Sequence, residues 1–164
     1  MRSLQQSALV RLEAAKGWYL LGNLREANRE LDALPATAQT HADVLEVRFA
    51  IYAKAQHWPV CMEISAAMLE LAPERPTSWL NSAFTLHRLK QTESAWASLR
   101  NVADRFPRVP SIPYHLACYA CCLGRLNESR ELLEEAIKLG GTPLREQALQ
   151  ECDLKPLWSA LTGI

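Results

Sequence analysis

The sequence lacks an excess of charge of either sign. Its 164 residues include 18 Lys and Arg and 18 Asp and Glu, which gives a formal net charge of zero and a pI near 6.9. A protein without a net field does not attract phosphate backbones or anionic headgroups from a distance. We therefore expect neither a nucleic acid nor a membrane as a partner.

Long apolar runs are missing as well. The longest, Ile112 to Gly124, contains His115 and is well short of the roughly 20 residues that span a bilayer. The amino-terminal segment has no continuous apolar core and no evident cleavage site, so it does not resemble a signal peptide. Paired cysteine spacing is also absent among Cys61, Cys118, Cys121, Cys122 and Cys152, which suits reduced thiols. These absences predict a cytoplasmic protein.

Sequence signatures of catalysis do not occur either. There is no Gly-rich phosphate loop, no H-E-x-x-H and no G-x-S-x-G. Neighbouring carboxylates such as Glu134 and Glu135 lie in segments that we expect to face solvent. We therefore predict no enzymatic activity and no cofactor. With 49% hydrophobic and 22% charged residues, the chain is nevertheless apolar enough to fold around a core.

What the sequence does contain is an internal repeat with a period of 34 residues. Its clearest copy, Trp79 to Pro107, has the apolar spacing of two helices. Residues 34 apart keep the same character: Ala27, Cys61, Ala95 and Ser129 are small, and Leu34, Met68, Val102 and Ala136 are apolar. Helix breakers mark the unit ends at Pro35, Pro73, Pro107 and Gly140-Gly141. The pattern predicts a series of helical hairpins.

The repeat resembles the tetratricopeptide repeat, whose unit has the pattern W-x2-L-G-x2-Y, then A-x3-F, then P. In the third copy the residues that carry the likeness are Trp79, Ser82, Ala83, Leu86, Ala95, Leu99 and Pro107. The second copy departs from it, since Arg48 and Phe49 stand where small residues are expected. The resemblance covers about residues 8–41, 42–75, 76–109 and 110–143. It implies an all-α fold, a right-handed α-solenoid superhelix of four hairpins with a concave inner face.

The residues after the fourth copy are predicted to cap it. Thr142 can cap a helix that begins at Pro143, and Asp153 can cap a short second helix. That second helix would present one apolar edge made of Leu154, Leu157, Trp158 and Leu161. Stacked repeats leave an open apolar end, so we expect residues 143–164 to cover it. Residues 1–164 would then form a single domain.

The resemblance implies that the first helix of each hairpin lines the concave groove and binds a protein or peptide. The candidate groove residues are Lys54, Asn81, Phe84, His87, Arg88, Tyr114, His115 and Cys118. Lys54 and Arg88 would suit a carboxylate of the partner. An alternative for Phe84 and Tyr114 is that they pack against each other between hairpins. The prediction is a non-enzymatic scaffold for protein interactions, whose partner the sequence does not identify.

Two alternatives remain open. His115, Cys118 and Cys122 lie at i, i+3 and i+7, so one helix face could bind a soft metal or oxidise as a thiol- or metal-responsive sensor. The spacing lacks the pair of Cys-x2-Cys knuckles of structural zinc sites, and cysteine is also a common filler of helical cores. The other alternative is self-association through the open repeat ends, which would give a homo-oligomer.

Overall fold

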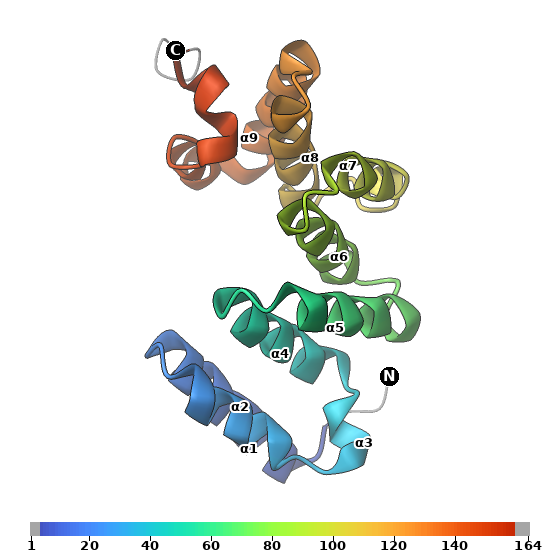
Figure 1. The fold of residues 1–164 in the computed structure, drawn as a ribbon, viewed down its shortest axis with the longest axis vertical. Coiled ribbons are helices and arrows are strands. Elements are labelled where there is room, and N and C mark those ends of the chain that lie inside the picture. The colour runs from blue at the N-terminus through green and yellow to red at the C-terminus, as the bar shows by residue number, and fades with distance from the viewer. Residues whose placement is uncertain (1–3, 160–164) are drawn as a thin grey trace. The chain divides into compact units, whose positions relative to one another are not determined.

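The computed structural model describes residues 4–159, which form helices and turns without a strand among them. The chain divides into two compact units, residues 1–73 and 74–164. Their boundary falls between the second and third predicted repeats. Within each unit, consecutive helices pack as pairs (Figure 1): α1 with α2, α4 with α5, α6 with α7, and α8 with α9. The predicted all-α helical-hairpin fold is confirmed.

The described residues of unit 1 form five helices: α1 (Gln6–Leu20), α2 (Leu24–Asp32), α3 (Ala36–Gln39), α4 (Ala42–Lys54) and α5 (Trp58–Leu71). The short helix α3 was not predicted. Pro35 does not simply end the repeat but occupies the N-cap position of α3. Ala38 is buried in the core of unit 1, and the Gln39 side chain donates to the Leu34 carbonyl at 3.0 Å. These two contacts hold an extra turn between the hairpins.

Unit 2 contains α6 (Pro76–Arg88), α7 (Thr92–Arg100), the 3-10 helix η1 (Ala103–Arg105), α8 (Ser111–Cys122), α9 (Leu126–Ala148) and the 3-10 helix η2 (Cys152–Leu157). The second helix of the third hairpin therefore ends earlier than its breaker Pro107 suggests. Helix α9 is interrupted at Gly141, whose φ of 69° and ψ of −159° are not helical. The predicted break at Gly140-Gly141 is present, as a kink between two helical segments.

The carboxy-terminal cap differs from the prediction in its detail. Glu151, and not Asp153, caps η2, because the Glu151 side chain accepts from the Asp153 N–H at 3.4 Å. Leu154 and Leu157 are buried in the core of unit 2. Trp158 packs against that core, and its indole N–H donates to the Ala148 carbonyl at 3.0 Å. Leu161, the fourth residue of the predicted apolar edge, lies outside the described residues.

The turns inside the four hairpins share one geometry. Gly22, Gln56, Lys90 and Gly124, which are 34 residues apart, all have positive φ, at 79°, 58°, 66° and 76°. At each turn this residue and the next donate their N–H groups to carbonyls of the preceding helix, as Lys90 does to His87 and Gln91 to Leu86. This is the Schellman motif, which ends a helix with a left-handed residue. The period seen in the sequence is thus a period of the backbone.

Small residues allow the paired helices to approach closely. Ala27, Cys61, Ala95 and Ser129, again 34 apart, are each fully buried. The Ser129 hydroxyl also donates to the Ala117 carbonyl at 2.7 Å, which links α9 to α8. The two positions that depart from the pattern are accommodated: Phe49 is buried, and Arg48 pairs with the Asp32 carboxylate at 2.7 Å.

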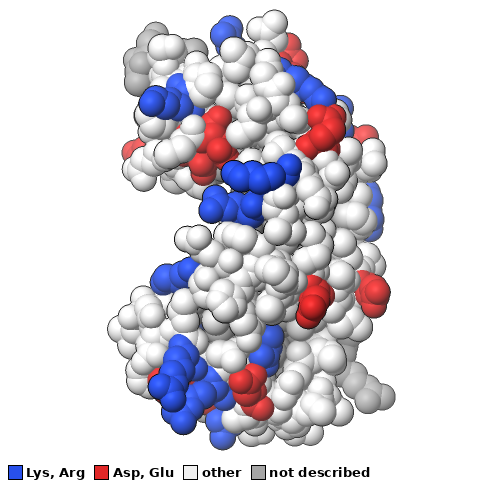
Figure 2. All heavy atoms as spheres, in the orientation of Figure 1, with Lys and Arg blue, Asp and Glu red and all other residues white. Residues whose placement is uncertain are grey.

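Charged side chains of both signs are interspersed with uncharged residues on the face drawn in Figure 2. That surface agrees with the zero formal charge of the chain. None of the helices in the described part of the chain combines the length and the apolar character that crossing a bilayer requires.

Candidate functional site

Helices α6 and α8 of unit 2 pack against each other and bring most of the predicted groove residues together. Their aromatic and imidazole rings form a connected cluster. His115 on α8 meets Phe84 of α6 edge to face, with ring centroids 6.4 Å apart, and meets Tyr114 edge to face at 5.6 Å. His87 of α6 lies 5.0 Å from the Tyr119 ring. A contact between Phe84 and Tyr114 was one alternative for these two residues; in the structure both rings pack on His115.

Tyr114 and Cys118 belong to the core of unit 2. They are 2% and 3% exposed, and burial is the main cause that raises the pKa of both side chains. They lie on the face of α8 that packs into the unit. Neither side chain presents a surface to a partner, so the expectation that these two residues line a groove is not met.

His115 is part-buried and neutral at physiological pH. Burial, with a smaller contribution from the charge of His87, lowers the pKa of its imidazole to about 4. A buried base loses hydration of its charged form, which favours the neutral form. His115 therefore serves as a packing ring in the cluster and not as a cation for an acidic partner.

Three predicted residues lie along one side of α6, at i, i+3 and i+7: Asn81, Phe84 and Arg88. We call this surface the α6 face. Asn81 and Phe84 are part-buried, and Arg88 is exposed. Lys54, the remaining predicted cation, is an exposed residue of unit 1. Its ammonium lies 4.7 Å from the centroid of the Tyr19 ring and 3.4 Å from the Tyr19 carbonyl oxygen.

The predicted metal ligands His115, Cys118 and Cys122 do not form a group. Among the residues that the structure describes, one set of three potential ligands has all its ligand atoms within 4.8 Å: His87, Cys122 and Asp153. Only Cys122 is common to both sets. Sequence reasoning missed Asp153 because it lies 66 positions from His87 and had been interpreted as a helix cap.

The surroundings of this set decide its chemistry. His87 Nε2 is 3.1 Å from Asp153 Oδ2, and His87 Nδ1 is 3.0 Å from the Thr92 hydroxyl. Partial burial and the Asp153 carboxylate raise the pKa of Cys122 to about 12. Catalytic thiols usually have a lowered pKa, and the shift at Cys122 is in the opposite direction. Arg88 and Lys90 complete the lining of the pocket, whose volume is about 370 Å³.

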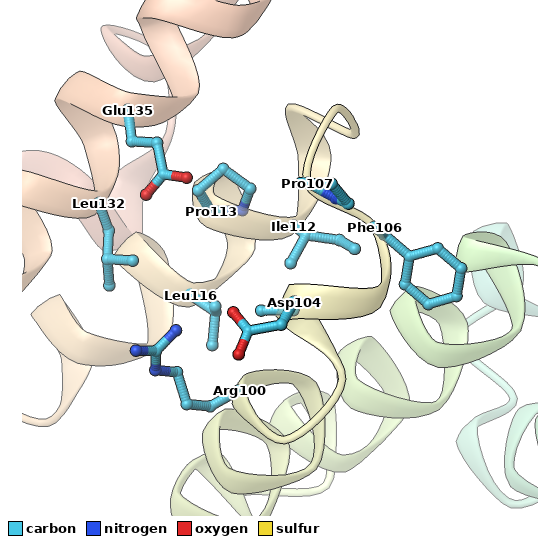
Figure 3. Close-up of a pocket in the computed structure, with 10 residues that line it drawn as sticks. Arg100, Asp104, Phe106, Pro107, Ile112, Pro113, Leu116, Leu132 and Glu135 are labelled. Carbon is cyan, nitrogen blue, oxygen red and sulfur yellow. The ribbon is translucent and has the colours of Figure 1, made fainter.

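A second pocket, of about 100 Å³, lies where η1, α8 and α9 meet (Figure 3). Apolar side chains of α8 and α9 form part of its wall, and Arg100, Asp104 and Glu135 line it as well. Pockets for small-molecule ligands usually have volumes of about 300 to 1,000 Å³. This one is too small to hold such a ligand, and nothing in the sequence pattern predicted it.

Comparison with known proteins gives matches in structure and none in sequence. Neither a protein-family model nor a curated protein matches the chain. TTC0263, a thermophilic tetratricopeptide-repeat (TPR) protein of Thermus thermophilus, superposes with a TM-score of 0.76 at 13% identity, over 96% of this chain and 100% of its own. MamA of Desulfovibrio magneticus RS-1, from residue 41 to its end, gives 0.71 at 17% identity, over 98% and 94%.

A third solved structure is YrrB, described as a TPR protein with an unusual peptide-binding site. It superposes with a TM-score of 0.66 at 12% identity, over 88% of this chain and 75% of its own. At these identities the likeness concerns the fold. Together with the turns and buried small residues that recur every 34 positions, it identifies the all-α helical-repeat fold of this chain as that of the tetratricopeptide-repeat proteins.

Proposed function

We propose that the chain is a protein-interaction module, without catalytic chemistry of its own, that binds an extended peptide segment of a partner on the α6 face. The observation that carries the proposal is the position of Arg88. It is exposed, it follows the part-buried Phe84 by one helical turn, and it borders the same pocket as Lys90. An exposed cation one helical turn from a part-buried aromatic ring suits a segment that carries both a carboxylate and an apolar side chain.

The energetics of interfaces support this choice of residues. A few residues dominate the binding energy of a protein interface, and Arg and aromatic residues are enriched at such interfaces. Arg88 can make a bidentate contact with a carboxylate, while Phe84 is held by its edge-to-face contact with His115 and so loses little freedom on binding. Two such anchors on one helix, one turn apart, are enough to orient a peptide.

Capture of the partner from cell extract tests the proposal. The wild-type chain, Arg88→Glu and Arg130→Glu are immobilised at equal density and their bound proteins compared. Arg130 is exposed on α9 of the same unit, so its reversal has the same effect on net charge. We expect Arg88→Glu to reduce the retained partner about 10- to 30-fold, as hot-spot residues do, and Arg130→Glu to retain it. Equal retention of the partner by both variants would contradict binding on the α6 face.

Self-association is a second candidate, which an observation in unit 1 favours. Helix α1 and the turn after it expose neighbouring large apolar side chains, and contiguous exposed apolar patches often mark interaction sites. Val10 is 62% exposed, Leu20 80% and Leu21 77%. Sedimentation of the wild-type chain and of Leu20→Glu tests it. A wild-type oligomer that the substitution dissociates supports self-association, and a monomer at all concentrations contradicts it.

We also propose a cytoplasmic location. All five cysteines are free thiols in the structure, which suits a reducing compartment.

A further inference from the structure

Three side chains of the kinds that coordinate transition metals converge on one pocket of unit 2. His87 comes from the last turn of α6, Cys122 is the last residue of α8, and Asp153 belongs to η2. Their ligand atoms all lie within 4.8 Å of one another. We propose that the His87–Cys122–Asp153 group binds a zinc ion, with three protein ligands and a fourth position open to the pocket. An imidazole nitrogen, a thiolate and a carboxylate oxygen are the ligand types that zinc takes in proteins.

The contact between His87 and Thr92 is the kind of second contact that metal-binding histidines have. A ligating imidazole usually donates its other ring N–H to an oxygen, which fixes the ring and its tautomer. His87 Nδ1 lies 3.0 Å from the Thr92 hydroxyl, and a hydroxyl can donate or accept. In the tautomer that carries the proton on Nε2, Nε2–H donates to Asp153 and Nδ1 accepts from Thr92. With metal, the single proton sits on Nδ1, and the Nε2 lone pair faces the ion.

The distances require a small adjustment. Zinc bonds of about 2.0 to 2.3 Å in a tetrahedral site place neighbouring ligand atoms roughly 3.4 to 3.6 Å apart. His87 Nε2 and Asp153 Oδ2, at 3.1 Å, are already that close. Cys122 Sγ lies within 4.8 Å of the other two ligand atoms. A movement of about 1 Å toward them is enough to reach the spacing of a tetrahedral site. The Cys122 side chain is exposed at the end of α8, where such a movement disturbs no core contact.

The charges of the site balance when the metal is bound. The Cys122 thiol releases its proton to water, and the thiolate and the Asp153 carboxylate then neutralise the two positive charges of the ion. Arg88 and Lys90 line the same pocket. Because these side chains are cationic, they favour an anionic group or a polarised water at the fourth position. This group differs from the set His115, Cys118 and Cys122 that helical spacing suggested, in which Cys118 is buried.

Cobalt titration of the reduced, tag-free, chelator-treated full chain tests this proposal. Cobalt substitutes for zinc and gives a thiolate-to-metal absorption band that reports a coordinated cysteine. We expect one equivalent of cobalt to produce the band and one equivalent of zinc to abolish it. Thr92→Val should keep the band and weaken affinity about 10- to 100-fold, as loss of an outer-shell partner does.

Cysteine substitutions decide which thiol is involved. Cys122→Ser should abolish the band, and Cys152→Ser should retain it, since Cys152 is also exposed and free but outside the group. Asp153→Asn should retain the band with a loss of affinity, because a neutral amide replaces the carboxylate ligand. Circular dichroism checks that each variant is folded. If Cys122→Ser does not fold, Asp153→Asn tests the site independently. The absence of a band in the wild type, or an unchanged band in folded Cys122→Ser, would overturn the proposal.

Discussion

At the residue scale, Gln56 and Lys90 occupy a backbone conformation that Gly22 and Gly124 occupy in the other two hairpins. A residue with a Cβ in the left-handed region costs roughly 1 to 2 kcal/mol relative to the right-handed one. The N–H groups of these residues and of their successors nevertheless make the same two hydrogen bonds at all four turns. The geometry of the hairpin therefore imposes the left-handed residue, and glycine is only the least strained choice.

Replacing Gln56 by glycine should stabilise the chain. The substitution relieves the strain of its φ of 58° and adds the conformational entropy of glycine to the unfolded chain. We expect a net gain of about 0.5 to 1 kcal/mol in the free energy of unfolding, measured by urea denaturation. The reverse change, Gly22→Ala, should destabilise by about 1 to 2 kcal/mol, because a Cβ there meets no atom within 4 Å and only backbone strain acts. Destabilisation by Gln56→Gly would contradict the account.

His115 should make stability depend on pH. Its pKa is about 4 in the folded chain and about 6.5 when unfolded. Between these values the unfolded chain binds more protons, so stability falls as the pH falls from about 6.5 to 4 and changes no further below. The loss amounts to up to about 3 kcal/mol.

The measurement compares urea denaturation of the wild type and His115→Gln across that pH range. The difference between their unfolding free energies should narrow as the pH falls. His57→Gln, which removes an exposed histidine, controls for the loss of a histidine side chain as such. Parallel curves for the wild type and His115→Gln would show that burial does not shift the titration of His115.

At the scale of elements, the spacing between paired helices is set by small residues. Ala83 on α6 and Ala95 on α7 are fully buried in one core cluster. Because the packing of a core leaves few voids, a larger side chain at such a position must displace a helix. The close packing of the paired helices therefore depends on the small side chains at these positions as much as on the apolar residues around them.

Ala95→Leu should destabilise unit 2 by about 1 to 3 kcal/mol through overpacking. Ser94→Leu, one position earlier and exposed, adds a similar side chain without entering the core and should change stability by less than about 0.5 kcal/mol. Thermal unfolding of the two variants distinguishes them. Similar melting temperatures would mean that α6 and α7 are not held as closely as the structure has them.

The repeated elements could be predicted from the sequence, as could the apolar edge of the cap at Leu154 and Leu157, whereas most details that occur once could not. The four turns and the buried small residues follow from the 34-residue period, since each copy repeats the evidence. Helix α3 has no counterpart in the other copies, so the 34-residue period could not predict it. The same holds for the candidate site: Asp153 meets His87 through the cap, whose path no repeat determines. Tyr114 was assigned to the groove because it lies outside the core pattern of its own hairpin. Packing with other elements of unit 2 buries it instead.

At the scale of the whole molecule, each unit has an apolar core of its own. The clusters around Leu12 and Leu31 in unit 1 and around Leu99 and Leu116 in unit 2 share no residue. The α6 face and the His87–Cys122–Asp153 group both belong to unit 2. The proposed contact with a partner and the proposed metal site therefore depend on one unit, and the exposed apolar side chains of α1 on the other.

Site-specific photo-crosslinking tests the proposed binding surface most directly, because it reports contact and not merely affinity. A photoreactive phenylalanine analogue is placed in living cells at position 84 on the α6 face, where it keeps an aromatic ring and leaves Arg88 in place, or at position 130 on α9. We predict a discrete crosslinked protein adduct from position 84 and none from position 130. Adducts of equal yield from both positions, or from neither, would contradict the assignment of partner binding to the α6 face.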